Sequence, residues 1–98
     1  MMVKTGIVYK KKGMIKSDIQ LILTLTNQPR LYFMRADTKE YKSDILLTQF
    51  VSATFKSNKK FEINCSRSKK QYLLKVPEND DAQMWVTKIN GVIHAHTR

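Results

Sequence analysis

The sequence predicts a mainly β domain in which seven antiparallel strands form a barrel or sandwich that is closed by one C-terminal α-helix. Apolar and polar residues alternate with a period of two in short segments separated by turn residues, which is typical of half-buried strands. After Pro77 the apolar residues recur instead at the spacing of an amphipathic helix. Ninety-eight residues suffice for one compact domain, and we therefore expect residues 1–98 to form a single unit.

The seven predicted strands are short, and polar or turn-forming residues separate them. They span residues 3–12, 18–26, 30–35, 41–47, 50–55, 61–65 and 71–75. The clearest alternation lies in residues 18–26, where Ile19, Leu21, Leu23 and Leu25 share one face. Short strands at this spacing indicate an antiparallel sandwich or barrel.

The helix is predicted from the side chains that follow Pro77. Asn79 or Asp80 is expected to cap it, because their side-chain oxygens accept hydrogen bonds from the free amides of a first helical turn. The apolar stripe of this helix comprises Ala82, Trp85, Ile89 and Val92 or Ile93. Such a stripe must lie on an apolar surface, and we expect it to cover the open side of the barrel.

The charge of the chain is large and unevenly distributed. Lys and Arg number 18 against 8 acidic residues, which gives a net charge of +10. Residues 1–75 hold 16 of the basic residues and 5 of the acidic ones, so the excess belongs to the first three quarters of the chain. A field of this sign attracts polyanions such as phosphorylated lipid head groups, nucleic acids and acidic protein surfaces.

Several function classes are disfavoured by composition. The chain has no apolar signal core and no apolar run long enough to cross a bilayer. Its single cysteine, Cys65, fits a reducing compartment. We therefore expect a cytoplasmic location. We interpret Cys65 as a buried strand residue. Cys65, His94 and His96 lack metal-ligand spacing, and no nucleophile or carboxylate accompanies the histidines. We therefore expect no metal, no cofactor and no catalysis by this chain.

Particular segments resemble pleckstrin-homology domains, and most of all the domain of the 3-phosphoinositide-dependent protein kinases. The similar segments are residues 3–13 (VKTGIVYKKKG), 20–24 (QLILT), 29–32 (PRLY) and 85–89 (WVTKI), together with Lys42 and Ile45. The resemblance implies a seven-stranded pleckstrin-homology barrel with one C-terminal helix. It also implies a regulatory, membrane-targeting module of a protein kinase, with a kinase domain elsewhere in the full-length chain.

The resemblance further implies a phosphoinositide or inositol phosphate site around the loop between the first two strands. Lys10 and Lys12 are two residues apart, so on a strand their side chains leave on one face and suit adjacent phosphates. By resemblance Lys42 and Lys69 converge on this pocket, and Lys16 in the loop reaches a phosphate. Ser17 would donate one neutral hydrogen bond.

The chain departs from the family at the start of the second strand. The family pattern has two arginines there, one residue apart, whereas Ser17 and Ile19 occupy these positions with Asp18 between them. Each basic residue near an anionic membrane contributes about 1 kcal/mol, so five lysines supply roughly 5 kcal/mol. Micromolar binding needs about 8 kcal/mol. We therefore expect phosphoinositide binding that is weak or broad in specificity, with recruitment to the plasma membrane.

Two other functions stay open. The first is a protein-interaction or autoinhibitory domain with a degenerate lipid site, which Ser17 and Ile19 favour. The second is an oligonucleotide-binding barrel in which Tyr32, Phe33 and Tyr72 stack on bases. Nucleic acid is the less favoured partner, because such barrels have fewer strands and these rings also suit core packing.

Overall fold

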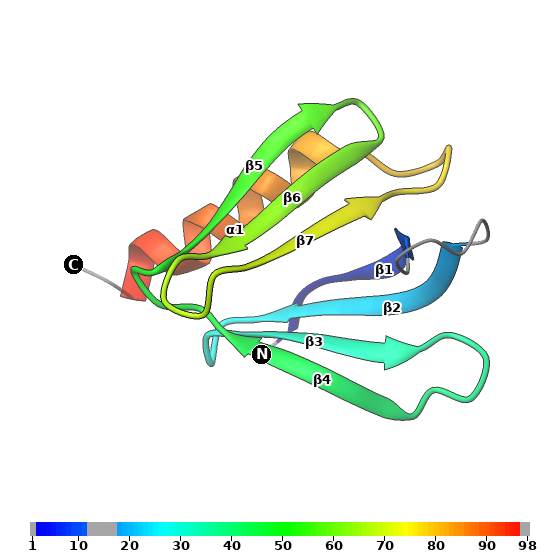
Figure 1. Ribbon diagram of the computed structural model, residues 1–98, viewed down its shortest axis with the longest axis horizontal. Helices are drawn as coiled ribbons and strands as arrows, with labels where there is room; N and C mark the ends of the chain where they lie inside the picture. The colour runs from blue at the N-terminus through cyan, green and yellow to red at the C-terminus, as the bar shows by residue number, and fades with distance from the viewer. Residues whose placement is uncertain (1, 12–17, 97–98) are drawn as a thin grey trace.

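The computed structural model describes residues 2–11 and 18–96. Its elements are, in chain order, β1 (Met2–Lys11), β2 (Asp18–Thr26), β3 (Arg30–Arg35), β4 (Tyr41–Leu46), β5 (Val51–Ser57), β6 (Lys60–Cys65), β7 (Lys70–Lys75) and α1 (Ala82–His96). All seven strands belong to one antiparallel sheet with the order β4-β3-β2-β1-β7-β6-β5 (Figure 1). The predicted fold class is therefore confirmed.

Strand β1 joins the two halves of this sheet. It pairs with β2 along its length, from Met2 to Lys11, but with β7 only at Tyr9 and Lys10. Because the second contact is short, the sheet folds over at β1 into one layer of β1–β4 and another of β5–β7 (Figure 1). The end of β1 that carries Lys10 therefore lies where the two layers meet.

Some strand boundaries differ by one or two residues from the predicted ones. Strand β4 ends at Leu46, and β5 begins at Val51 and continues to Ser57. Phe50 lies in a turn, because the Val51 N–H donates to the Thr48 carbonyl oxygen at 3.0 Å. Lys12, the predicted end of the first strand, lies outside the described residues.

The core between the layers follows the alternation that the sequence predicts. Leu21, Leu23 and Leu25 of β2 are at most 1% exposed. Ile19, at the start of the strand, packs against this core but is only partly buried. Cys65 is the last residue of β6, so its predicted place in a strand is confirmed. It packs against the core but is only partly buried, so the prediction that it is buried was wrong.

Helix α1 packs mainly on β5 and also contacts β6 and β1 (Figure 1). The predicted apolar stripe is confirmed, since its buried residues include Ala82, Trp85, Ile89, Val92 and Ile93. Trp85 is fully buried, and its ring stacks on that of Phe61 with the centroids 6.1 Å apart. Burial of a ring system of this size contributes roughly 4 kcal/mol, which makes Trp85 the main anchor of the helix.

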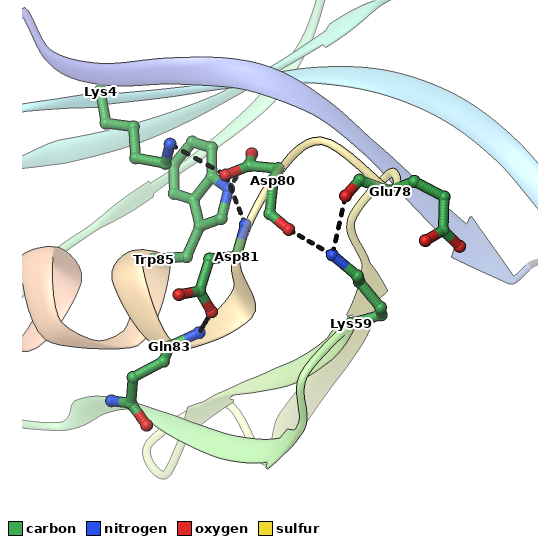
Figure 2. A network of polar contacts seen from close by, with 7 residues as sticks. All are labelled: Lys4, Lys59, Glu78, Asp80, Asp81, Gln83 and Trp85. Carbon is green, nitrogen blue, oxygen red and sulfur yellow. Dashed lines mark hydrogen bonds and ion pairs between the residues drawn. The ribbon is translucent and has the colours of Figure 1, made fainter.

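The helix is capped by Asp81, so the expected cap at Asn79 or Asp80 was wrong. The Asp81 carboxylate accepts a hydrogen bond from the Gln83 N–H at 2.9 Å and so satisfies one free amide of the first turn. Asp80 is not available for this role, because its carboxylate points toward Trp85 and β1 (Figure 2).

The Asp80 carboxylate links the helix to β1 (Figure 2). It accepts hydrogen bonds from the Asp81 N–H at 2.7 Å, from Trp85 Nε1 at 3.0 Å and from Lys4 Nζ at 3.2 Å. The Lys4 ammonium also lies 4.8 Å from the centroid of the Trp85 ring. Burial disfavours the ionised carboxylate, but these donors outweigh burial and lower the pKa of Asp80.

Two further residues, Gly6 and Lys59, contribute to this link between the helix start and β1. A Cβ atom at Gly6 would lie 3.3 Å from Asp80 Oδ2 and 3.4 Å from the Trp85 side chain, so glycine allows β1 to pass close to both. Lys59, in the turn between β5 and β6, donates to the carbonyl oxygens of Asp80 at 2.7 Å and Glu78 at 3.0 Å (Figure 2). These contacts therefore connect β1, the β5–β6 turn and the start of the helix.

The outer edge of β5 is covered by the helix rather than by another strand. The Asn90 side chain accepts a hydrogen bond from the Ala53 N–H at 3.0 Å and donates to the Ala53 carbonyl oxygen at 2.9 Å. This amide replaces the hydrogen bonds that a neighbouring strand would make to Ala53, which is one way in which proteins protect an edge strand.

We predict that Asn90→Ala lowers the free energy of unfolding by about 1–2 kcal/mol, because it leaves both backbone groups of Ala53 unpaired in a partly buried place. Alanine favours a helix by a few tenths of a kcal/mol, which offsets a small part of this loss. Urea unfolding measures the change. Asn79→Ala, at an exposed position before the helix, is the control and should change stability little. Equal midpoints for the two variants would contradict the role of Asn90.

The lowered pKa of Asp80 predicts an acid-sensitive contribution to stability. The pKa of Asp80 is lower in the folded protein than in the unfolded chain. Its carboxylate therefore stabilises the fold fully when the pH is above the unfolded-state pKa, and this contribution is lost as the pH falls through the folded-state pKa. Asp80→Asn should therefore lower the free energy of unfolding above about pH 5, and the difference from the wild type should shrink toward pH 2. Unfolding curves at several pH values test this, and a pH-independent difference would refute it.

Candidate functional site

A cavity of about 520 Å³ opens between the first two strands and the β3–β4 hairpin. Its lining residues are Ile7, Ile19, Gln20, Arg35, Ala36, Asp37 and Lys42. Two cationic side chains and one carboxylate therefore share a hollow whose other walls are apolar or neutral. A few polar groups that converge in a partly apolar hollow are typical of a small-ligand site.

The turn between β3 and β4 sets the positions of Arg35 and Asp37. The Arg35 N–H donates to the Glu40 carbonyl oxygen at 2.9 Å, and the Lys39 N–H donates to the Arg35 carbonyl oxygen at 2.8 Å. Lys39 has a φ of 61°, a left-handed conformation that is uncommon outside glycine. Asp37 Oδ1 accepts the Thr38 N–H at 2.8 Å, which holds the carboxylate within the turn.

Arg35 and Asp37 form an exposed ion pair at this cavity. Arg35 Nε and Nη2 donate to the two oxygens of Asp37 at 3.2 Å and 3.1 Å. These hydrogen bonds raise the pKa of the Arg35 guanidinium and lower the pKa of the Asp37 carboxyl group. Both side chains are therefore charged at neutral pH, and Asp37 offsets part of the positive potential that Arg35 and Lys42 create.

Of the predicted site residues, Lys42 lines this cavity and Lys10 borders it. Lys10 pairs with Ile19, which is a lining residue, across the β1–β2 ladder. Its ammonium nitrogen lies 5.0 Å from the centroid of the Tyr72 ring, a favourable cation–π distance. The charge of Lys10 is thus directed toward β7, next to the cavity rather than into it.

The remaining predicted residues are placed differently. Lys69, with a φ of 58°, lines a separate hollow together with Asn64, Cys65, Ser66, Lys70 and Gln71. This hollow shares no lining residue with the cavity that contains Lys42. Lys12, Lys16 and Ser17 lie outside the described residues.

Arg35 is a candidate site residue that the sequence analysis missed. It was interpreted only as the end of a hairpin strand. Two signals could have identified it: it follows Leu31 and Phe33 at even spacing, and it precedes a turn that carries an acidic residue two positions later. Its convergence with Lys42 depends on the register of β3 against β4, which the sequence does not display.

Base stacking by Phe33 is disfavoured by its burial, whereas the protein-interaction alternative stays open. Within residues 2–11 and 18–96, no three His, Cys, Asp or Glu side chains group in a way that could hold a metal ion. No helix in the same ranges is both long and apolar enough to cross a bilayer. Phe33 is 2% exposed and stacks against Tyr72 with centroids 5.6 Å apart, so Phe33 is a core residue rather than a surface for bases.

Solved structures with low sequence identity share this fold. The C-terminal PH domain of pleckstrin, solved in complex with D-myo-Ins(1,2,3,4,5)P5, matches with a TM-score of 0.80 and 18% identity, over 95% of this chain and 99% of that one. The PH domain of human oxysterol binding protein-related protein 11 matches with a TM-score of 0.77 and 17% identity, over 96% of this chain and 82% of that one.

A closer relative in sequence is a probable serine/threonine-protein kinase, pdkA, of Dictyostelium discoideum, which is 36% identical over 88 residues. The match covers 90% of this chain and 12% of that protein, so the chain spans a small part of its relative's length. A family model described as PH domain matches residues 1–97. PH domains are non-catalytic modules, which confirms that this chain is not itself a catalyst. On these grounds, the chain belongs to the PH domain family.

Proposed function

We propose that this PH domain is a membrane-targeting module that binds phosphoinositide or inositol phosphate head groups in the cavity between β1, β2 and the β3–β4 hairpin. The observation that carries the proposal is the convergence of Arg35 and Lys42 on one cavity of about 520 Å³. The pleckstrin neighbour was solved with an inositol pentakisphosphate, which supports a ligand of this class.

Arg35 replaces, in this proposal, the missing arginines of the second strand. It pairs with Leu21 across the β2–β3 ladder, and the adjacent Ala36 N–H donates to the Gln20 carbonyl oxygen at 3.4 Å. The guanidinium therefore approaches the cavity from β3 while Ile19 lines it from β2. An arginine fork binds two phosphate oxygens at once, a directed contact that the predicted lysines lack.

Lys42 supplies a point charge within the cavity and Lys10 one at its border, and we assign Lys12, Lys16 and Ser17 to the same ligand. Lys69 lines a different hollow, in the β6–β7 turn that also carries Arg67, so we do not assign it to this head group. Asp37 competes with the ligand for Arg35. One directed arginine, opposed by a carboxylate, is consistent with weak or broad recognition.

The kinase relative suggests the wider role. We infer that residues 1–98 form one regulatory domain of a longer phosphoinositide-dependent protein kinase, and that head-group binding recruits that protein from the cytoplasm to the plasma membrane. The supporting observation is the 36% identity with the Dictyostelium kinase over 90% of this chain.

Sedimentation with liposomes that carry different phosphoinositide isomers tests the proposal. At low salt we expect binding to several isomers, and we expect Lys42→Gln to weaken it about fivefold, which corresponds to the loss of one charge near an anionic surface. Arg35→Gln should weaken it further, because the fork is lost. Lys88→Gln on α1 is the control and should bind as the wild type does. Failure to bind any isomer at low salt would refute the lipid function.

The ion pair at the cavity yields a second prediction, in which a substitution strengthens phosphoinositide binding instead of weakening it. Asp37→Asn removes the carboxylate that competes for Arg35 but keeps an oxygen that accepts the Thr38 N–H, so the turn is preserved. We expect severalfold tighter binding to phosphoinositide liposomes, and the gain should decline as salt is added. Isothermal titration with soluble inositol hexakisphosphate measures the same change without a membrane. Unchanged or weaker binding would show that Arg35 does not contact the phosphates.

A further inference from the structure

At the opposite end of the molecule from the proposed head-group site lies an exposed apolar surface. We call it the crossover surface and define it by Pro29, Leu46, Phe50, Arg67 and His96, which lie around the connection between β4 and β5. In Figure 1 this connection and the β3–β4 turn lie at opposite ends of the long axis. Leu46 is 48% exposed and Phe50 is 37% exposed, which is unusual for large apolar side chains that lie close together.

Two hollows flank these side chains. One, of about 200 Å³, lies toward the end of β6, and its lining includes Leu46, Thr48, Phe50 and Arg67. The other, of about 500 Å³, lies toward the helix end, and its lining includes Pro29, Leu46, Thr48, Phe50 and His96. Because both hollows share Leu46, Thr48 and Phe50, they form one continuous grooved apolar surface.

The charge around this groove has one sign. The Arg67 guanidinium carbon lies 4.7 Å from the centroid of the Phe50 ring. This is a cation–π arrangement that holds the cation at the groove. Among the described residues that line the two hollows, none is acidic. The nearest acidic side chain in sequence, Asp44, is bound by Arg30 and Tyr41. A ligand that combines apolar side chains with carboxylates would therefore match both the shape and the charge.

We propose that the crossover surface docks a protein segment in which bulky apolar side chains are flanked by acidic residues. Its apolar side chains would enter the two hollows, and a carboxylate would pair with Arg67. Aromatic and arginine side chains are the residues that most often dominate the energy of protein interfaces, and here Phe50 and Arg67 are already stacked.

Two other occupants fit less well. A second copy of the chain is disfavoured, because each copy carries a net charge of +10 and like charges repel. A membrane is disfavoured, because the crossover surface faces away from the bilayer if the head-group site faces it, as in the function proposed above. The domain would thus hold a membrane at one end and an acidic protein segment at the other.

The test uses the 98-residue chain and a fluorescein-labelled dodecapeptide with a Leu-Phe pair flanked on both sides by glutamates. We expect saturable binding by fluorescence anisotropy below about 1 mM, and about tenfold weaker binding for Arg67→Glu. Phe50→Ala should also weaken it severalfold. Lys42→Glu, at the other end of the molecule, is the matched charge reversal and should change peptide binding less than twofold or so.

A second peptide with Ser-Ser in place of Leu-Phe separates docking from charge attraction. Equal binding of both peptides, equal effects of Arg67→Glu and Lys42→Glu, or no saturable binding would each overturn the proposal. Sedimentation with phosphoinositide liposomes is measured in parallel. Retained liposome binding by Arg67→Glu supports separate surfaces, and a loss equal to that of Lys42→Glu would assign the crossover surface to the membrane. Failure of Lys42→Gln to weaken liposome binding would refute the head-group site without affecting the peptide result.

Discussion

The contact between the buried Trp85 and the Asp80 carboxylate is the interaction on which the rest of the molecule depends. The indole N–H donates to Asp80 Oδ2 at 3.0 Å, and the same carboxylate binds Lys4 of β1. Gly6 allows β1 to pass within contact distance of both partners. Because β1 is held there against the helix and also pairs with β2 and β7, its far end is directed to the junction of the layers. The position of Lys10 beside the candidate cavity is therefore a consequence of packing at the other end of the strand.

The large positive charge does not by itself mark the site. Several cations have structural partners: Lys4 binds Asp80, Arg30 binds Asp44 and Lys56 lies 3.7 Å from Glu62. Lys59 donates to two backbone carbonyl oxygens at the helix start. The cations with a plausible ligand role are those that meet in a hollow. In the cavity between β1, β2 and the β3–β4 hairpin, Arg35 and Lys42 meet, and Asp37 is the one carboxylate among the described lining residues.

The two proposed surfaces divide the molecule by chemistry as well as by position. The head-group site combines two cations with a partly apolar wall and lies at the β3–β4 turn, whereas the crossover surface combines exposed Leu46 and Phe50 with Arg67. A phosphorylated sugar needs directed charges, and an acidic protein segment needs apolar contact with one cation to align it. A regulatory domain that senses a membrane and contacts a protein could use both surfaces at once, because neither overlaps the other.

The sequence by itself determined the fold class, the helix stripe and the inward face of β2, because these follow from the spacing of residues that are close in the chain. Leu21, Leu23 and Leu25 alternate, and Trp85 and Ile89 recur at helical spacing, whatever surrounds them. The resemblance to PH domains, which the family match confirms, added Lys42 as a site residue. Local rules did not decide which acidic residue caps the helix, since Asp80 and Asp81 both suit a cap and only the position of Trp85 separates them.

Only the tertiary structure decided which distant cations meet. Arg35 reaches the cavity through the register of β3 against β2 and β4, and Lys69 lines another hollow because it lies in the turn between β6 and β7. Leu46 and Phe50 are exposed because of where the strands end. Strand β4 ends at Leu46, the next residue, Leu47, is buried, and Phe50 lies in the turn before β5 begins. The physical reason is the same in each case: alternation along a strand is a local property, whereas strand register and the fold of the sheet at β1 are set by contacts between residues far apart in the chain.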